Sequence, residues 1–197
     1  MKYTIQGKRS RLGLPIILGA VFLLVVAATI YYFVTRPTYT TFVAPNPGVH
    51  LRYSSKLEQI PLTKADKQDK FLLRLKDSTG KADKMLITVR YEDGLHALAI
   101  AKRNLRDMLL ENASRIYPGR FPDYHELNRR SFTQHGHDAG ELFFTYTGPN
   151  GQAIRQRFMV VTRNDDQAIY LSAQAQKNDF DRLNRAYFED IATSLSP

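Results

Sequence analysis

The chain has 197 residues, with 28 Lys or Arg against 19 Asp or Glu, a formal net charge of +9 and no cysteine. The lack of cysteine excludes disulfides, cysteine nucleophiles, thiolate metal sites and a lipid-modified cysteine anchor. Residues 1–36 hold five basic and no acidic side chains, which leaves only 23 basic against 19 acidic in the rest. A domain so nearly balanced in charge favours no nucleic-acid partner.

An uncharged stretch runs from Leu12 to Thr35 near the amino terminus. A helix needs roughly 20 apolar residues to cross a bilayer core about 30 Å thick, and Leu14 to Val34 supplies 21. Three aromatic residues end the stretch, where rings favour the lipid headgroup layer: Tyr31, Tyr32 and Phe33. We therefore expect a transmembrane helix over residues 12–35 that contacts the lipid bilayer through Leu14 to Val34.

Basic residues flank this stretch unequally, with four before it and Arg36 alone close behind it. The side of a membrane with more Lys and Arg is normally cytoplasmic. We therefore expect a single-pass protein of the cell membrane, with a cytoplasmic basic tail over residues 1–11 and the remainder extracytoplasmic. The alternative is a signal peptide cleaved before Thr29, and a buried core helix is a third interpretation.

Residues 36–48 contain three prolines and one glycine, a composition typical of an extended linker. Part of this segment, Tyr39 to Val43, could instead form a first strand. The sequence predicts one extracytoplasmic domain over residues 49–197, a size that can bury a core.

Alternating apolar residues predict a strand at residues 49–53 and, after a polar loop over 54–70, a hairpin of strands 71–75 and 85–91. Asp93 is a plausible helix N-cap. Beyond it, apolar residues recur at helical spacing up to Pro118-Gly119, which predicts one long helix over residues 95–117.

The second half of the chain predicts a weak strand over 124–134 and then a three-strand meander. Its strands cover residues 141–147, 154–162 and 168–174, separated by the turn signals Gly148-Pro149-Asn150-Gly151 and Asn164-Asp165-Asp166. A last helix begins near Asn178-Asp179. Its apolar stripe consists of Phe180, Leu183, Tyr187, Ile191 and Leu195.

Three of these segments resemble the carboxy-terminal half of PsbP-like domains: residues 140–146 (GELFFTY), 168–171 (AIYL) and 187–195 (YFEDIATSL). The family shows a strand, a polar turn, a strand ending near Tyr-Leu and a helix ending in a Phe-x-x-Ile-x-x-Ser-Phe/Leu pattern. The resemblance implies an α+β fold, an α/β/α sandwich with an antiparallel sheet and a helix on each face. With the anchor expected over residues 12–35, the chain resembles a membrane-anchored, bacterial-type member, and the resemblance implies an envelope protein without catalysis.

One group of side chains has metal-ligand types: His135, His137, Asp138 and Glu141. Imidazoles two residues apart can share one ion that a carboxylate completes. The same residues, with Gly136 between the histidines, equally suit a surface hairpin turn. We expect no cofactor.

A second candidate is a basic patch of Lys102, Arg103 and Arg106 on one face of the predicted long helix. It is either a solvated helix face or a contact for anionic headgroups or cell-wall polymer. No nucleophile elbow, phosphate-binding loop or zinc-protease motif is present in the sequence. We therefore expect a non-catalytic binding or scaffold protein with a protein partner in the membrane or envelope; a ligand- or metal-binding domain is the alternative, and an envelope hydrolase the third.

Overall fold

The computed structural model describes residues 13–77, 84–95 and 104–197, without the side chains of residues 13–20, 33 and 35. The chain forms two compact units, Met1–Pro37 and Thr38–Pro197. The first unit contains α1 (Gly13–Thr35). Among the described residues, no helix is both long and apolar enough to cross a membrane. The helix expected over residues 12–35 is thus present, and the structure lends no support to its membrane crossing.

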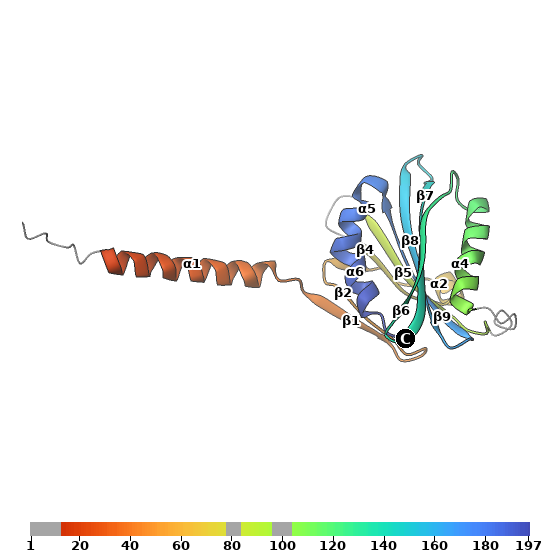
Figure 1. Cartoon of the computed structure of the whole chain (residues 1–197), viewed down its shortest axis with the longest axis horizontal. Helices are drawn as coiled ribbons and strands as arrows, with labels where there is room; N and C mark the ends of the chain where they lie inside the picture. Colours follow the sequence, from red (N-terminus) through yellow and green to blue (C-terminus); the bar gives the residue numbers. More distant parts are fainter. Residues whose placement is uncertain (1–12, 78–83, 96–103) are drawn as a thin grey trace, which may run out of the picture. The chain divides into compact units, whose positions relative to one another are not determined.

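The second unit is built on a seven-stranded antiparallel sheet with the strand order β3-β4-β5-β9-β8-β7-β6 (Figure 1). The predicted hairpin appears as neighbouring β4 and β5, and the predicted meander as β7, β8 and β9. The strands are β3 (Leu57–Gln59), β4 (Phe71–Asp77), β5 (Met85–Glu92), β6 (His125–Gln134), β7 (His137–Thr147), β8 (Ala153–Arg163) and β9 (Gln167–Gln176).

Helices cover both faces of this sheet, which confirms the sandwich architecture. One face packs against a continuous helical segment of α5 (Lys177–Leu183), the π-helical η2 (Asn184–Phe188) and α6 (Glu189–Ser194). The other face packs against α4 (Leu105–Ile116) and the 3₁₀ turn η1 (Tyr117–Gly119). In Figure 1, α4 lies on one side of the strands and α5 with α6 on the other. All five residues of the predicted carboxy-terminal stripe are buried.

The first two strands form a separate two-stranded sheet, β1 (Tyr39–Ala44) with β2 (Val49–Ser54). This hairpin packs on the carboxy-terminal helix rather than joining the main sheet. The Ser194 hydroxyl accepts the Arg52 backbone N–H at 3.0 Å, and His50 pairs with Ser196 as an isolated bridge. Of the two interpretations of residues 36–48, a first strand matches β1, and the compact unit already begins at Thr38.

Two predicted segments differ from the structure. Within the helix predicted over residues 95–117, α4 begins at Leu105, after Asn104, which has the extended backbone of an N-cap; residues 96–103 lie outside the described chain. Asp93 does not cap α4 and pairs with Lys70. The polar loop predicted over residues 54–70 contains β3 and a short helix, α2 (Lys64–Gln68).

Close packing of α4 on β7 depends on Gly140. A β-carbon at this position would lie 2.5 Å from Leu110 Cδ1, well inside van der Waals contact. Leu110 is 1% exposed and surrounded by the core, so its side chain has little room to move away.

We therefore expect Gly140→Ala to lower the free energy of unfolding by about 1–3 kcal/mol through overpacking. Chemical denaturation followed by circular dichroism measures the change. Gly119→Ala is the matched control, because its β-carbon would meet no atom within 4 Å. Equal stability of the two variants would contradict the close approach.

Candidate binding groove

The sheet face under α4 is divided into an apolar half and a polar half. Residues paired across antiparallel strands point to the same face, so the register shows where the change occurs. One row along this face reads Lys76, Leu86, Gln174, Gln156 and Phe144, and the next reads Arg74, Thr88, Ser172, Phe158 and Leu142. The residues on β7 are fully buried under α4, whereas those on β4, β5 and β9 are half-buried and mostly polar.

Four adjoining hollows follow this polar half and form what we call the sheet groove. Their volumes are about 360, 240, 210 and 260 Å³. Consecutive hollows share lining residues: Arg74, Leu86 and Gln174 link the first two, and Thr88, Gln156 and Ser172 the next pair. The groove therefore follows β5, whose 8 residues at about 3.3 Å each extend about 26 Å.

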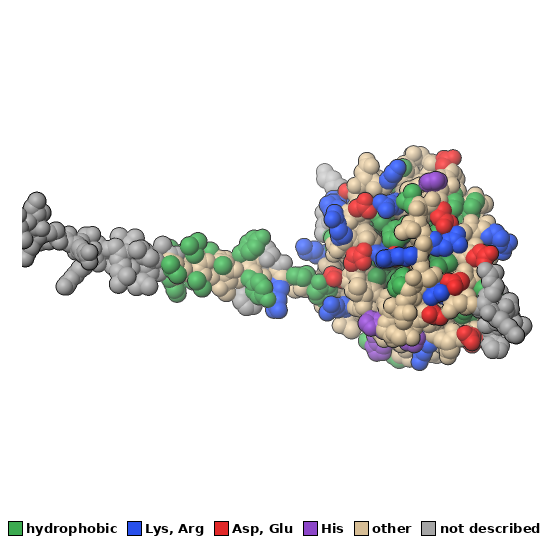
Figure 2. Space-filling view, viewed as in Figure 1, with side chains coloured by type: hydrophobic (Ala, Val, Ile, Leu, Met, Phe, Trp, Pro, Cys, Tyr) green, Lys and Arg blue, Asp and Glu red, His purple; other side chains and the backbone are tan. Residues whose placement is uncertain are grey.

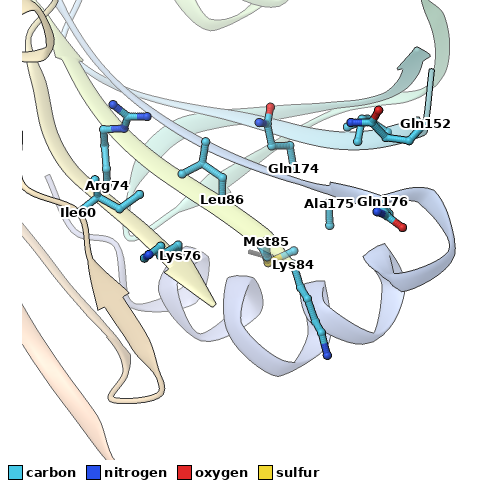
Figure 3. Close-up of a pocket in the computed structure, with 11 residues that line it drawn as sticks. Ile60, Arg74, Lys76, Lys84, Met85, Leu86, Gln152, Gln174, Ala175 and Gln176 are labelled. Atoms are coloured by element: carbon cyan, nitrogen blue, oxygen red, sulfur yellow. The ribbon is translucent and has the colours of Figure 1, made fainter. Parts of the chain in front are cut away.

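Figure 3 shows the first hollow. The side chains of Arg74, Leu86 and Gln174 rise from neighbouring strands on the same side of the sheet, and Gln152 lies beyond them. Lys84 extends the other way, toward a helix, so it is not part of the polar platform (Figure 3).

The short helix α2 forms one wall of the groove through a capping box. The Asp66 carboxylate accepts the Thr63 backbone N–H at 2.9 Å, and the Thr63 hydroxyl accepts the Asp66 N–H at 3.1 Å. The same carboxylate accepts the Arg74 guanidinium at 2.9 Å and so orients it. The hydrogen bond from the Thr63 backbone, together with its hydroxyl and Arg74, holds the pKa of Asp66 below its ordinary value.

Two polar atoms at the centre of the groove have no hydrogen-bond partner among the described residues, Gln156 Oε1 and Arg74 Nε. Gln156 is only 8% exposed, and its amide nitrogen donates to the Ser172 hydroxyl at 2.6 Å. Gln174 Oε1 accepts the Tyr146 hydroxyl at 3.0 Å, which leaves its amide nitrogen as a donor. Buried polar groups are normally hydrogen-bonded, so unpaired ones within a hollow indicate a place for a ligand group.

Arginines lie at the α4 end of the groove. The Arg90 guanidinium lies 4.7 Å from the Tyr170 ring centroid and 3.2 Å from Glu92. Exposed Arg120 lines the last two hollows, and no described carboxylate lies within ion-pair distance of it. Burial raises the pKa of Tyr117 to about 12 and raises that of Tyr170 as well, so both phenols stay neutral at physiological pH.

The predicted metal-ligand residues do not converge on one point. His135 and Gly136, both at positive φ, form the tight turn between β6 and β7, and the His135 ring contacts the Thr193 carbonyl at 2.9 Å. Asp138 faces α4, where Asn104 bonds it at 2.5 Å, whereas Glu141 lies on the opposite face of β7. Over the described ranges, no group of three or more His, Asp or Glu side chains is placed to hold a metal.

Glu141 belongs instead to a buried ionic network. Fully buried, it accepts Arg157 at 2.6 Å and also Arg130, while Arg157 bonds Glu189 at 2.7 Å. Asn184, in the π-helical turn, donates to Glu189 at 2.9 Å. The Arg157 guanidinium also lies 4.7 Å from the Phe188 ring centroid. This network ties β6, β7 and β8 to the carboxy-terminal helix.

The predicted basic patch is described only at Arg106. Its side chain is 14% exposed and bonds Asp107 at 2.8 Å and Asp138 at 3.5 Å. It therefore joins α4 to β7 rather than standing free in solvent. Lys102 and Arg103 lie outside the described residues. Figure 2 shows acidic and basic side chains interspersed over one face of the second unit.

The groove was not predicted from the sequence, although the sequence contains a pattern that indicates it. The alternation that marked Met85, Ile87 and Val89 as buried also places Leu86, Thr88 and Arg90 on the opposite face. Gln156 on β8 and Gln174 on β9 repeat that polar pattern, and Gln152 lies just before β8. What the sequence lacked was the register that brings these residues together.

Comparison with known proteins gives the fold. No family model and no curated protein matches the sequence. The structure is similar to cyanobacterial PsbP (CyanoP) from Synechocystis, with TM-score 0.58, 11% identity and coverage of 83% of this chain and 94% of that one. It is also similar to LpqN of Mycobacterium tuberculosis, which is involved in cell envelope biogenesis. The TM-score is 0.56 and the identity 14%, and the alignment covers 85% of this chain and 95% of LpqN. A third similar structure is the Saccharomyces cerevisiae Ran-binding protein Mog1p. Its TM-score is 0.51 and its identity 8%, over 82% of this chain and 96% of Mog1p.

The fold is therefore PsbP-like. The resemblance noted in residues 140–146, 168–171 and 187–195 agrees with this at the level of fold. These segments form β7, β9 and the carboxy-terminal helix of the PsbP-like unit.

Arg157→Met should lower the free energy of unfolding by about 3–5 kcal/mol, because it leaves the Glu141 charge buried without its main partner. The double variant Glu141→Leu/Arg157→Met removes both buried charges. We expect it to recover most of the loss in chemical denaturation. A double variant no more stable than Arg157→Met would contradict the account.

Asp66→Asn tests the wall of the groove through pH. A carboxyl with a lowered pKa stabilises the fold above its unfolded value, about 3.9, and this contribution is lost as pH falls through the folded pKa. We expect Asp66→Asn to be less stable than wild type at neutral pH, with the gap closing below about pH 4. Urea midpoints at both pH values measure this; a gap independent of pH would refute it.

Proposed function

We propose that the chain is a single-pass, membrane-anchored extracytoplasmic binding protein that acts as an accessory to a membrane or envelope partner without catalysis. Its binding surface is the sheet groove. The observation that carries the proposal is the open polar half of a sheet face, with unpaired buried polar atoms at its centre.

The groove suits binding better than catalysis. Its described lining includes hydroxyls at Thr88 and Ser172 but no histidine to act as their general base. Asp66, the carboxylate in the central hollow, is engaged by Thr63 and Arg74. The groove thus presents hydrogen-bond donors and acceptors on a rigid sheet, as a binding site does.

Anchoring rests on the sequence alone. Leu14 to Val34 has the length and the lack of charge of a membrane span, and the basic residues ahead of it favour a cytoplasmic amino terminus. The fold itself is compatible with this setting, since LpqN, which shares it, is described as involved in cell envelope biogenesis. The Ran-binding role of Mog1p supports the idea that such a fold can serve as a binding module.

A photo-reactive residue introduced at Thr88 of the full-length protein should crosslink to a discrete partner in the membrane fraction of living cells. The same residue at Arg182, on α5 at the opposite face, is the matched control and should not. Protease added to spheroplasts should remove residues 38–197. Identical crosslinks from both positions would refute the groove as the contact surface, and full protection from protease would refute the orientation.

A further inference from the structure

We infer that the sheet groove recognises an acidic oligosaccharide, a hydroxyl-rich sugar chain that carries carboxylates or phosphates. The inference rests on the proposed function, because it names the chemistry that the binding surface takes.

The first argument concerns how the groove can form hydrogen bonds. It is floored by β4, β5, β9 and β8; the last three are paired on both sides, and β4 pairs with β5 along one side and with β3 and Ile60 over Arg74–Asp77 on the other. A peptide that binds by strand addition needs a sheet edge. Recognition here must therefore go through side chains, and the ligand must supply its own polar groups.

The second argument concerns the groups at the centre. Gln156 Oε1 requires a donor, and Arg74 Nε requires an acceptor. Both belong to the same central hollow of about 240 Å³, together with Thr88, Ser172 and Gln174. A hydroxyl both donates and accepts, so neighbouring sugar hydroxyls can satisfy this mixed set, which a carboxylate or an alkyl group alone cannot.

The third argument concerns apolar anchors. Protein partners usually insert aromatic or aliphatic side chains into apolar pockets. Two aromatic rings along this groove are occupied: Phe158 and Tyr170 are 8% and 7% exposed and stack on each other at 5.7 Å, whereas Phe71 is half-buried. The rest of the lining mixes amides, hydroxyls and guanidinium groups with half-buried apolar side chains such as Leu86, a combination that suits the hydroxyls and the C–H face of a sugar ring.

The charge of the ligand follows from Arg120. Arg74, Arg90 and Lys76 are each paired with a carboxylate, namely Asp66, Glu92 and Glu58. Arg120, at the α4 end, has no such partner within the described chain. An acidic group on the sugar chain, placed here while hydroxyls fill the central hollow, would complement this one cation.

The test uses the full-length protein purified in detergent and two probes of equal length, an oligogalacturonate and a neutral cello-oligosaccharide. Titration calorimetry should show binding of both, with the acidic chain several-fold tighter.

Gln156→Leu should weaken the binding of both saccharides by about tenfold, the effect of one lost buried hydrogen bond. Arg120→Gln, on an exposed side chain that does not risk the fold, should remove only the preference for the acidic chain. Arg182→Gln, a cation on the opposite face, should change neither.

Two results would overturn the inference. One is no binding of either saccharide by a protein whose circular dichroism is native. The other is binding of the acidic chain that Arg182→Gln weakens as much as Arg120→Gln and that Gln156→Leu leaves unchanged, which would show general charge attraction. If Thr88 still crosslinks to a partner in cells in either case, the proposed function stands and only the ligand class fails.

Discussion

The placement of α4 on β7 and β8 is the constraint on which the candidate site depends. A helix is about 10 Å across and strands lie about 4.8 Å apart, so one helix covers about two strands. Gly140 lets α4 settle onto β7, with Leu110 at the contact. The seven-stranded sheet has no second long helix on this face among the described residues. Among the described residues, the face over β4, β5 and β9 therefore has only α2 beside it, and it carries the polar side chains that a surface open to solvent requires.

The opposite face of the sheet is covered by different elements. There the carboxy-terminal segment from α5 to α6 covers the sheet, and the β1–β2 hairpin packs on that segment in turn. The cost of burying Glu141 is offset because Arg157 and Arg130 both reach it. A π-helical turn places Asn184 beside Glu189, so the network closes on the helix. π-Helical turns often occur at functional sites, but here the irregularity has a structural use.

Most strands and the closing helix were predictable from the sequence because they follow from periodicity, whereas the sandwich was implied by the resemblance to PsbP-like domains. Alternation over Met85–Val89 and along the meander revealed strands, and the stripe from Phe180 to Leu195 revealed the closing helix. The limits of α4 were not predictable, since Leu98 and Ala101 continue the helical spacing across Asn104. The helix α2 was missed because five residues are too short for a periodic signal, and only the Thr63–Asp66 capping pair marks it.

The site residues were less predictable because sites depend on register and on face. His137, Asp138 and Glu141 are close in sequence, yet alternation along β7 sends Asp138 and Glu141 to opposite faces. Gln156, Arg74 and Ser172 are far apart in sequence and meet only because β8 pairs with β9, β9 with β5 and β5 with β4. Proximity along the chain favoured a cluster that the strands separate. The physical signal for the groove is a polar residue at a position whose strand neighbours are buried, which becomes informative once the strand order is known.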